Sequence, residues 1–185
     1  MTPFDIAFNT TMGIEGDGIL TNDKLDPGGQ TYSGISRVYW PEWEGWQIVD
    51  NCSQPFNNSA RYHLDDVVRS FYRVNFWNRI QGDKLAELSL KIACEVFDSA
   101  VNVGVSQAVK FLQESHNVTS RGSDIDVDGK LGQKTVEAIR VFLSWKPGPE
   151  SVNEEILLNC CNGEQYIFYK NNPNHRRYRG WFRRV

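Results

Sequence analysis

From about residue 62 to residue 171, apolar side chains recur at steps of three and four residues, the spacing of one face of an α-helix. This recurrence predicts helices over about 62–77, 85–102, 107–115 and 132–145. A last helix should run from Ser151 to about Asn171, because Ser151 and Glu154 have the spacing of a capping box. Helices with one apolar face bury that face against one another, so this stretch should fold as packed helices.

The first 36 residues follow a different pattern. A short helix that ends at the Glu15-Gly16 step is predicted by apolar residues at helical spacing, namely Phe4, Ala7, Phe8 and Met12. Residues 16–36 are rich in Gly, Asp, Asn and Thr, which predicts a small β-hairpin, and residues 38–59 should form a loop with at most short helical turns. We therefore expect a mainly α (α+β) fold in which a small β-hairpin lobe near residues 18–36 packs against a helical lobe.

Charge and composition exclude several classes of function. The net charge of −3 gives no sign of a nucleic-acid partner, and 40% apolar with 23% charged residues is typical of a soluble globular protein. No apolar run reaches the roughly 20 residues of a membrane-spanning helix. The N-terminus has neither the basic region nor the apolar region of a secretory signal. We expect a monomer that is made in the cytoplasm without a signal peptide.

The cysteines do not suggest a metal site. The four cysteines are Cys52, Cys94, Cys160 and Cys161. They form no CxxC pair and do not have a metal-ligand spacing with the histidines. We expect mostly buried thiols, and a disulfide from Cys52 to one of the other three stays open as an alternative.

A second candidate metal site is the acidic stretch at residues 124–129. Asp124, Asp126, Asp128 and Gly129 match the opening of a calcium-binding loop. The twelfth position of that loop, which should supply a bidentate Glu, is Thr135. The sequence therefore predicts no metal site here.

Several motifs occur in a fixed order along the chain: Glu15-Gly16, then Asp26-Pro-Gly-Gly-Gln-Thr31-Tyr-Ser-Gly34-Ile35, then Phe97-Asp98-Ser-Ala-Val-Asn102-Val-Gly104, Leu112-Gln113 and Asp128-Gly129-Lys-Leu-Gly132-Gln-Lys-Thr135. The first two motifs resemble those of the family-108 glycoside hydrolases, which are phage-type N-acetylmuramidases. The later motifs resemble the helical peptidoglycan-binding region of the same family. The resemblance implies a lysozyme-like fold with a muramidase catalytic region at 1–95 and a peptidoglycan-binding-like region at 96–185, packed into one compact unit.

The resemblance also implies a reaction, the hydrolysis of the β-1,4 bond between N-acetylmuramic acid and N-acetylglucosamine in peptidoglycan. Breaking a glycosidic bond requires a proton on the leaving oxygen and, for inversion, a base that activates water. Glu15 is the expected acid, Asp26 the expected base and Thr31 a holder of the water. Asp23 stays an alternative base, because the interval from Glu15 to Asp26 is longer than is usual in phage lysozymes.

Substrate contacts and the chain terminus complete the expectations. Residues expected to line the glycan cleft are Gly29, Tyr32, Gly34, Asp98 and Asn102, although an interhelical hydrogen bond is the alternative for the last two. No cofactor is expected. Six basic residues lie near the C-terminus: Lys170, Arg176, Arg177, Arg179, Arg183 and Arg184. One expectation is that they contact the anionic cell envelope. The alternative is that they cap helix ends while their aromatic neighbours dock on the core.

Two other functions fit the same motifs. A lytic transglycosylase would use one acid and the sugar's own hydroxyl, and a non-catalytic peptidoglycan-binding or scaffolding module would keep only the fold. The biological role that we expect is a bacteriophage endolysin that reaches the cell wall through a holin-type lesion. A secreted antibacterial effector or a developmental scaffold would carry the same catalytic unit.

Overall fold

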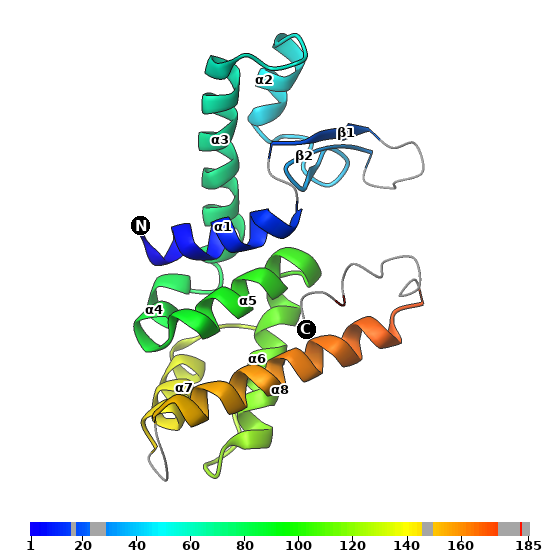
Figure 1. Ribbon diagram of the computed structural model, residues 1–185. Coiled ribbons are helices and arrows are strands. Elements are labelled where there is room, and N and C mark those ends of the chain that lie inside the picture. Colours follow the sequence, from blue (N-terminus) through cyan, green and yellow to red (C-terminus); the bar gives the residue numbers. More distant parts are fainter. Residues whose placement is uncertain (16–17, 23–28, 146–149, 174–181, 183–185) are drawn as a thin grey trace. The chain divides into compact units, whose positions relative to one another are not determined.

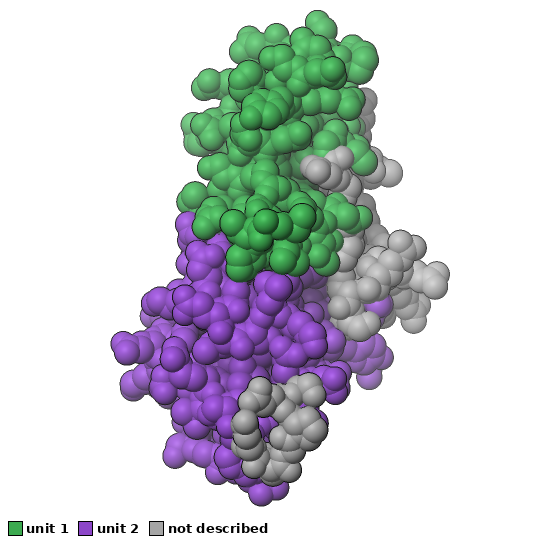
Figure 2. Space-filling model, turned by 60° about the vertical axis from the view of Figure 1, so that its left-hand side comes forward, with its two compact units in different colours: residues 1–75 green, residues 76–185 purple. Residues whose placement is uncertain are grey.

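The computed structural model describes residues 1–15, 18–22, 29–145, 150–173 and 182. The chain divides into two compact units, Met1–Asn75 and Phe76–Val185 (Figure 2). The predicted boundary at residues 95–96 separates a catalytic region from a peptidoglycan-binding-like region. It is a boundary between functions and stays a prediction. None of the helices in the described ranges combines the length and apolar character that a membrane crossing needs.

The described part of unit 1 contains two longer helices, one short helix and a small sheet (Figure 1). Its three strands are antiparallel in the order β1-β2-β3. The elements in chain order are α1 (Pro3–Glu15), β1 (Leu20–Asn22), β2 (Gln30–Tyr32), β3 (Ile35–Ser36), α2 (Gly45–Asn51) and α3 (Asn58–Tyr72). The π-helical turn η1 (Arg73–Trp77) continues α3. The predicted hairpin and first helix are confirmed, and the predicted loop at 38–59 contains the seven-residue helix α2.

The start of α1 is encoded locally. The Thr2 backbone N–H donates to the Asp5 carboxylate at 2.7 Å, and the Asp5 N–H donates to the Thr2 hydroxyl at 3.2 Å. This reciprocal pair is a capping box, and Pro3 between them needs no hydrogen-bond acceptor for its nitrogen. Arg69 of α3 donates to the same Asp5 carboxylate. The cap therefore also fixes the first turn of α1 to α3.

Aromatic rings fill the core of unit 1. Phe8 of α1 packs edge-on against Tyr72 of α3, with ring centroids 5.7 Å apart. Trp43 stacks on Tyr32 at 6.1 Å and meets Trp46 edge-on at 5.1 Å. These contacts join the sheet, α2 and the preceding loop, so the tryptophan-rich segment belongs to the core of this unit.

Unit 2 consists of five helices in its described part: α4 (Gly82–Leu88), α5 (Leu90–Val103), α6 (Val105–Thr119), α7 (Gln133–Ser144) and α8 (Glu150–Asn171). Helix α5 packs against α4, α6 and α8 and buries one face that includes Ile92, Val96 and Phe97 (Figure 1). The predicted packing of helix on helix is confirmed.

The predicted helix over 85–102 is wrong in one respect, because the chain breaks at Ser89. Its backbone is extended, at φ −160° and ψ 119°, and its hydroxyl accepts the Ile92 N–H at 3.1 Å. The same hydroxyl donates to Glu154 at 2.5 Å, and Lys91 donates to Glu154 at 2.8 Å. Glu154 therefore binds the start of α5. Helix α8 begins at Glu150, one residue before the start predicted at Ser151.

A carboxylate pair links α6 and α8. Burial raises the pKa of Glu164, and the nearby Glu114 raises that pKa further. A carboxyl whose pKa is raised on folding stabilises the protein below its unfolded pKa, and this contribution is lost as pH rises through the folded pKa.

We expect Glu164→Gln to be more stable than the wild type at pH 8, with the difference shrinking toward pH 4. Urea unfolding at both pH values measures this. An equal difference at both pH values would show that the charge of Glu164 is not the cause.

All four cysteines are free thiols, so the alternative of a disulfide from Cys52 is wrong. Cys52 lies in unit 1 and the other three lie in unit 2. Only Cys161 is buried, and burial raises its pKa to about 12. Its thiol is therefore an inert part of the core.

Candidate active site

The sheet of unit 1 is built around a tight turn at Ser33-Gly34. Tyr32 and Ile35 are register partners, so the turn has only two residues. Ser33 has φ +45° and Gly34 has φ +79°. Two successive positive φ values define a type I′ turn, whose twist matches that of the strands on either side. Gly34 is well suited to the second position because it has no Cβ.

Tyr72 anchors this turn to α3. Its hydroxyl donates to the Ser33 carbonyl at 2.8 Å, in a buried position. A Cβ at residue 34 would lie 2.6 Å from that hydroxyl oxygen, which is closer than van der Waals contact allows. The hydrogen bond from Tyr72 therefore requires glycine at position 34, and the positive φ of the turn favours it.

Ser33 also holds the chain that follows Glu15. The Gly18 N–H donates to the Ser33 hydroxyl at 2.9 Å, and the Ser33 N–H donates to the Ile19 carbonyl at 3.1 Å. Through Ser33, α3 thus fixes the hairpin together with Gly18 and Ile19, which precede β1. Neither Ser33 nor Tyr72 was predicted from the sequence to be a functional residue.

One face of the sheet carries a row of hydroxyl groups. Thr21 pairs with Thr31, and Thr31 pairs with Ser36, so the three side chains project from the same face. Thr31 is half-buried, and its hydroxyl donates to the Gly29 carbonyl at 3.4 Å. The position of Thr31 on this polar face is compatible with holding a water molecule.

Tyr32 points to the opposite face, because side chains alternate along a strand. It is 1% exposed and packs against Trp43 and Phe56. A side chain with so little exposed surface cannot contact a glycan, so the predicted substrate-binding role of Tyr32 is corrected to a role in the core.

Gly29 precedes β2 and has φ +64°. A Cβ at this position would lie 3.1 Å from a methyl group of Val38. Glycine therefore allows the chain to turn into β2 while lying close to the segment after β3. Gly29 therefore has a structural role in the sheet, and its predicted contact with substrate stays a prediction.

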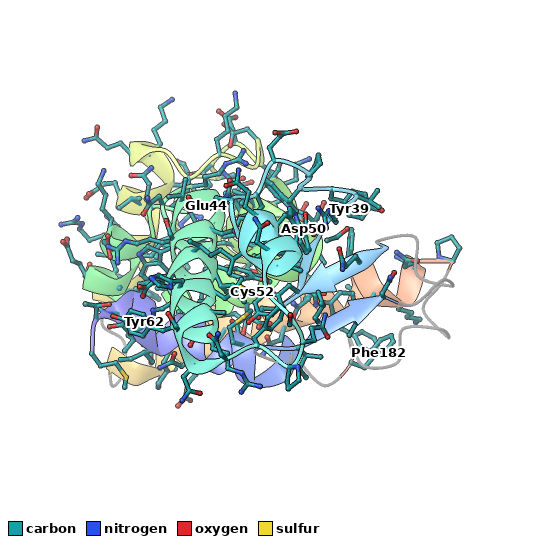
Figure 3. The ribbon with its side chains drawn as sticks, turned by 90° about the horizontal axis from the view of Figure 1, so that it is seen from above. Tyr39, Glu44, Asp50, Cys52, Tyr62 and Phe182 are labelled. Atoms are coloured by element: carbon teal, nitrogen blue, oxygen red, sulfur yellow. The ribbon has the colours of Figure 1, made fainter. Side chains whose placement is uncertain are left out.

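Arg37 ties the hairpin to α2. Its guanidinium donates to the Gln30 side chain at 2.7 Å and to both oxygens of Asp50, at 2.8 Å and 2.5 Å. It also lies 5.0 Å from the ring of Trp46. The hydrogen bond from Arg37 lowers the pKa of Asp50 below its ordinary value. Seen from above, Asp50 lies on α2 beside the strands (Figure 3). The hairpin is thus held on one side by Tyr72 and on another by Arg37.

The predicted catalytic residues lie around this hairpin in the sequence. Glu15 is the last residue of α1, as predicted, but its side chain lies outside the described part of the chain. Asp26 and its alternative Asp23 fall within residues 23–28, which are also outside the described residues. Thr31 is therefore the predicted catalytic residue whose side chain the structure describes.

Asp98 and Asn102 lie on α5 in unit 2, whereas the hairpin residues belong to unit 1. The Asn102 amide donates to the Tyr169 hydroxyl on α8 at 2.5 Å. Gln165 donates to the same hydroxyl at 2.9 Å and to Ser99 at 3.0 Å. The interhelical alternative is therefore confirmed for Asn102, and substrate contacts of Asp98 and Asn102 stay predictions.

The Asp-rich stretch is closed by a side chain that the sequence analysis did not single out for this role. Gln113 of α6 is 1% exposed, and its carbonyl oxygen accepts the Gly129 N–H at 2.9 Å. Its amide nitrogen donates to Asp128 at 2.9 Å and to Thr135 at 3.2 Å. The hydrogen bond from the Gln113 amide to Asp128 lowers the pKa of Asp128 below its ordinary value. Within the described residues, no cluster of three acidic, histidine or cysteine residues could hold a metal ion.

Most of the basic C-terminal segment lies outside the described residues. Phe182, which the structure does describe, packs edge-on against Tyr169 at 5.9 Å and Tyr166 at 5.8 Å. The predicted docking of an aromatic residue of this segment on the helices of unit 2 is confirmed.

Comparisons with known proteins cover both units. A family model described as Glycosyl hydrolase 108 matches residues 8–104, and one described as Predicted Peptidoglycan domain matches residues 107–185. No curated protein sequence matches the chain. Among solved structures, the chain is similar to one titled "Structure of Brucella abortus SagA", with 24% identity and a TM-score of 0.69 over 98% of this chain and 88% of that one. At this identity the likeness shows the fold, and it confirms the predicted mainly helical, lysozyme-like architecture.

Proposed function

The chain belongs to the glycosyl hydrolase 108 family, and from that premise we propose that it is an N-acetylmuramidase of the lysozyme type. It would cleave the β-1,4 bond between N-acetylmuramic acid and N-acetylglucosamine in the glycan strands of peptidoglycan. The matching peptidoglycan domain over residues 107–185 supports peptidoglycan as the substrate.

The proposed chemistry uses three residues of unit 1. Glu15 donates a proton to the leaving oxygen, Asp26 removes a proton from the attacking water, and the Thr31 hydroxyl orients that water. Attack from the face opposite the leaving group inverts the anomeric carbon. Neither a metal ion nor an organic cofactor takes part in these steps.

The hydrogen bond from Gly18 to Ser33 is the observation that carries this proposal. Gly18 lies three positions after Glu15 in the sequence, and Ser33 is in the turn directly after the strand of Thr31. The bond therefore links the chain that leaves the expected acid to the hairpin that presents Thr31 on its polar face. Such links support pre-organised catalytic groups, which need to be held close to the productive geometry.

We expect the product of this reaction to be the inverted α-anomer. If Asp26 activates a water, the two carboxyl groups need a separation of about 6.5 to 9.5 Å, whereas a retaining enzyme needs about 5 to 5.5 Å. Proton NMR of the reaction mixture, recorded before mutarotation, distinguishes the anomers. A fresh β-anomer would remove Asp26 as the base and leave it either a nucleophile or no participant.

Mass spectrometry of the same products separates the other candidate functions. A hydrolase adds one water per cleaved bond, whereas a lytic transglycosylase forms a 1,6-anhydro sugar without net addition of water. A binding or scaffolding module would release no fragments at all. Thr31 on the polar face favours hydrolysis, because a transglycosylase needs no group to orient water.

For the biological role, we propose a monomeric endolysin of a phage or prophage that is delivered to the wall through a holin-type lesion. The resemblance of the catalytic motifs to those of phage-type muramidases supports this role. The six cations between Lys170 and Arg184 would add electrostatic attraction to anionic polymers of the envelope. Expression with and without a pore-forming protein tests delivery, since lysis without the pore would contradict this route.

A further inference from the structure

Unit 2 contains a cavity of about 800 Å³ between the end of α6, the segment that follows it, and α7. Its lining includes Arg121, Ile125, Lys134, Glu137, Phe142 and Trp145. The volume lies in the range of pockets that hold small ligands, about 300 to 1,000 Å³. The cavity lies within residues 107–185, and no residue of the candidate active site contributes to it.

The floor of the cavity is apolar and partly open to solvent. Val141 is 58% exposed and Trp145 is 43% exposed, and they adjoin the buried ring of Phe142. Ile125 and Ala138 extend the same apolar surface. Exposed apolar side chains gathered in a hollow, with polar groups at its edge, are typical of ligand-binding sites.

The edge of the cavity carries charges of both signs. Arg121 and Lys134 supply cations, and Asp124 and Glu137 supply carboxylates. The Arg121 guanidinium lies 4.8 Å from the Trp145 ring centroid. This contact covers part of the aromatic surface and holds the cation beside the apolar floor.

We propose that this cavity binds the peptide stem of peptidoglycan, which deepens the proposed function and rests on it. A peptide stem is short, carries free carboxylates and an amine, and has methyl side chains. The carboxylates match Arg121 and Lys134, the amine matches Asp124 and Glu137, and the methyl groups match the floor at Val141. A glycan strand instead needs a bare aromatic face and neutral hydrogen-bonding groups, whereas here Arg121 lies over part of the Trp145 ring.

The test uses the full chain with Glu15→Gln, so that probes are not cleaved. Isothermal titration calorimetry compares three probes: the disaccharide with its peptide, the tetrapeptide stem alone, and the disaccharide without peptide. We expect Arg121→Ala and Val141→Asp each to weaken binding of both peptide-bearing probes about tenfold or more, the scale of one lost charge-assisted contact or apolar anchor.

Two variants serve as matched controls. Arg79→Ala removes an exposed cation of unit 2, and Val118→Asp places a charge at an exposed valine of α6, and neither residue lines the cavity. Both should bind the peptide probes like the parent chain. Circular dichroism of all four variants checks that each one is folded.

Three outcomes would overturn the proposal. Peptide binding that survives both cavity variants would show that the stem binds elsewhere, and absence of peptide binding in the parent chain would show that no such site exists. Loss of binding to the peptide-free disaccharide in the cavity variants would assign the cavity to the glycan. Hydrolysis of peptide-free glycan strands by the wild type measures the proposed function separately. If the wild type does not hydrolyse these strands while Arg121→Ala still weakens peptide binding, the muramidase assignment fails and the proposed binding site stands.

Discussion

Glu15→Gln is expected to lower the rate of cell-wall lysis by about 10² to 10⁴-fold, the usual contribution of a positioned general acid or base. The amide has the shape of the carboxyl group but cannot give up a proton to the leaving oxygen. The thermal midpoint should stay within a few degrees, because Glu15 ends α1 and a negative charge there opposes the helix dipole. The clearing of a suspension of cell walls, followed by turbidity, measures the rate.

Glu42→Gln is the matched control for this prediction. Glu42 is an exposed carboxylate of the same unit, so its loss changes the net charge equally but should leave lysis unchanged. Lysis by Glu15→Gln at the wild-type rate would remove Glu15 from the mechanism. Equal losses in both variants would instead point to a general effect of charge on wall binding.

Gly34→Ala is expected to destabilise the chain and to reduce activity at the same time. A side chain at φ +79° costs about 1 to 2 kcal/mol. The new Cβ would also displace the Tyr72 hydroxyl, and a buried carbonyl left without its donor costs about 1 to 3 kcal/mol. Since each kcal/mol lowers the midpoint of a chain of about 150 to 250 residues by about 2 to 4 °C, a drop of about 4 °C or more should be seen.

Gly13→Ala provides the control for Gly34→Ala. Gly13 lies in α1, and no atom lies within 4 Å of a Cβ built there. Alanine is favoured over glycine within a helix by about 1 kcal/mol, so this variant should be as stable as the wild type or slightly more stable. Thermal unfolding followed by circular dichroism compares the two. A midpoint for Gly34→Ala equal to that of the control would mean that the turn tolerates a side chain and that Tyr72 is not its anchor.

The helices could be predicted from the sequence because their signal is local. Apolar spacing alone identified the helical stretches of unit 2, and the Glu15-Gly16 step marked the end of α1. The break at Ser89 was missed because Leu85, Leu88 and Ile92 keep their spacing across it. What breaks the helix is the extended Ser89, whose hydroxyl is held by Glu154. That partner lies far along the chain, so no local pattern reveals it.

The candidate site was predictable only in part, for a related reason. Thr31 and Tyr32 are adjacent in a strand, so alternation alone would have shown that they cannot both face the same cleft. The turn of unit 1 and the Asp-rich stretch of unit 2 are each anchored by a side chain that binds a distant backbone group: Tyr72 at Ser33, and Gln113 at Gly129. Such contacts leave no periodicity and no fixed spacing in the sequence, so they become visible only when the chain is folded.

The close approach of position 34 to the Tyr72 hydroxyl has a consequence for how relatives of this chain can diverge. The two positions should co-vary. A lineage that replaces the tyrosine with phenylalanine removes the oxygen that a Cβ at position 34 would meet, and the turn can then accept Asn or Asp, which tolerate left-handed backbone. A lineage that keeps the tyrosine must keep glycine. The order of substitution is therefore constrained: the hydroxyl has to be lost before the glycine can change.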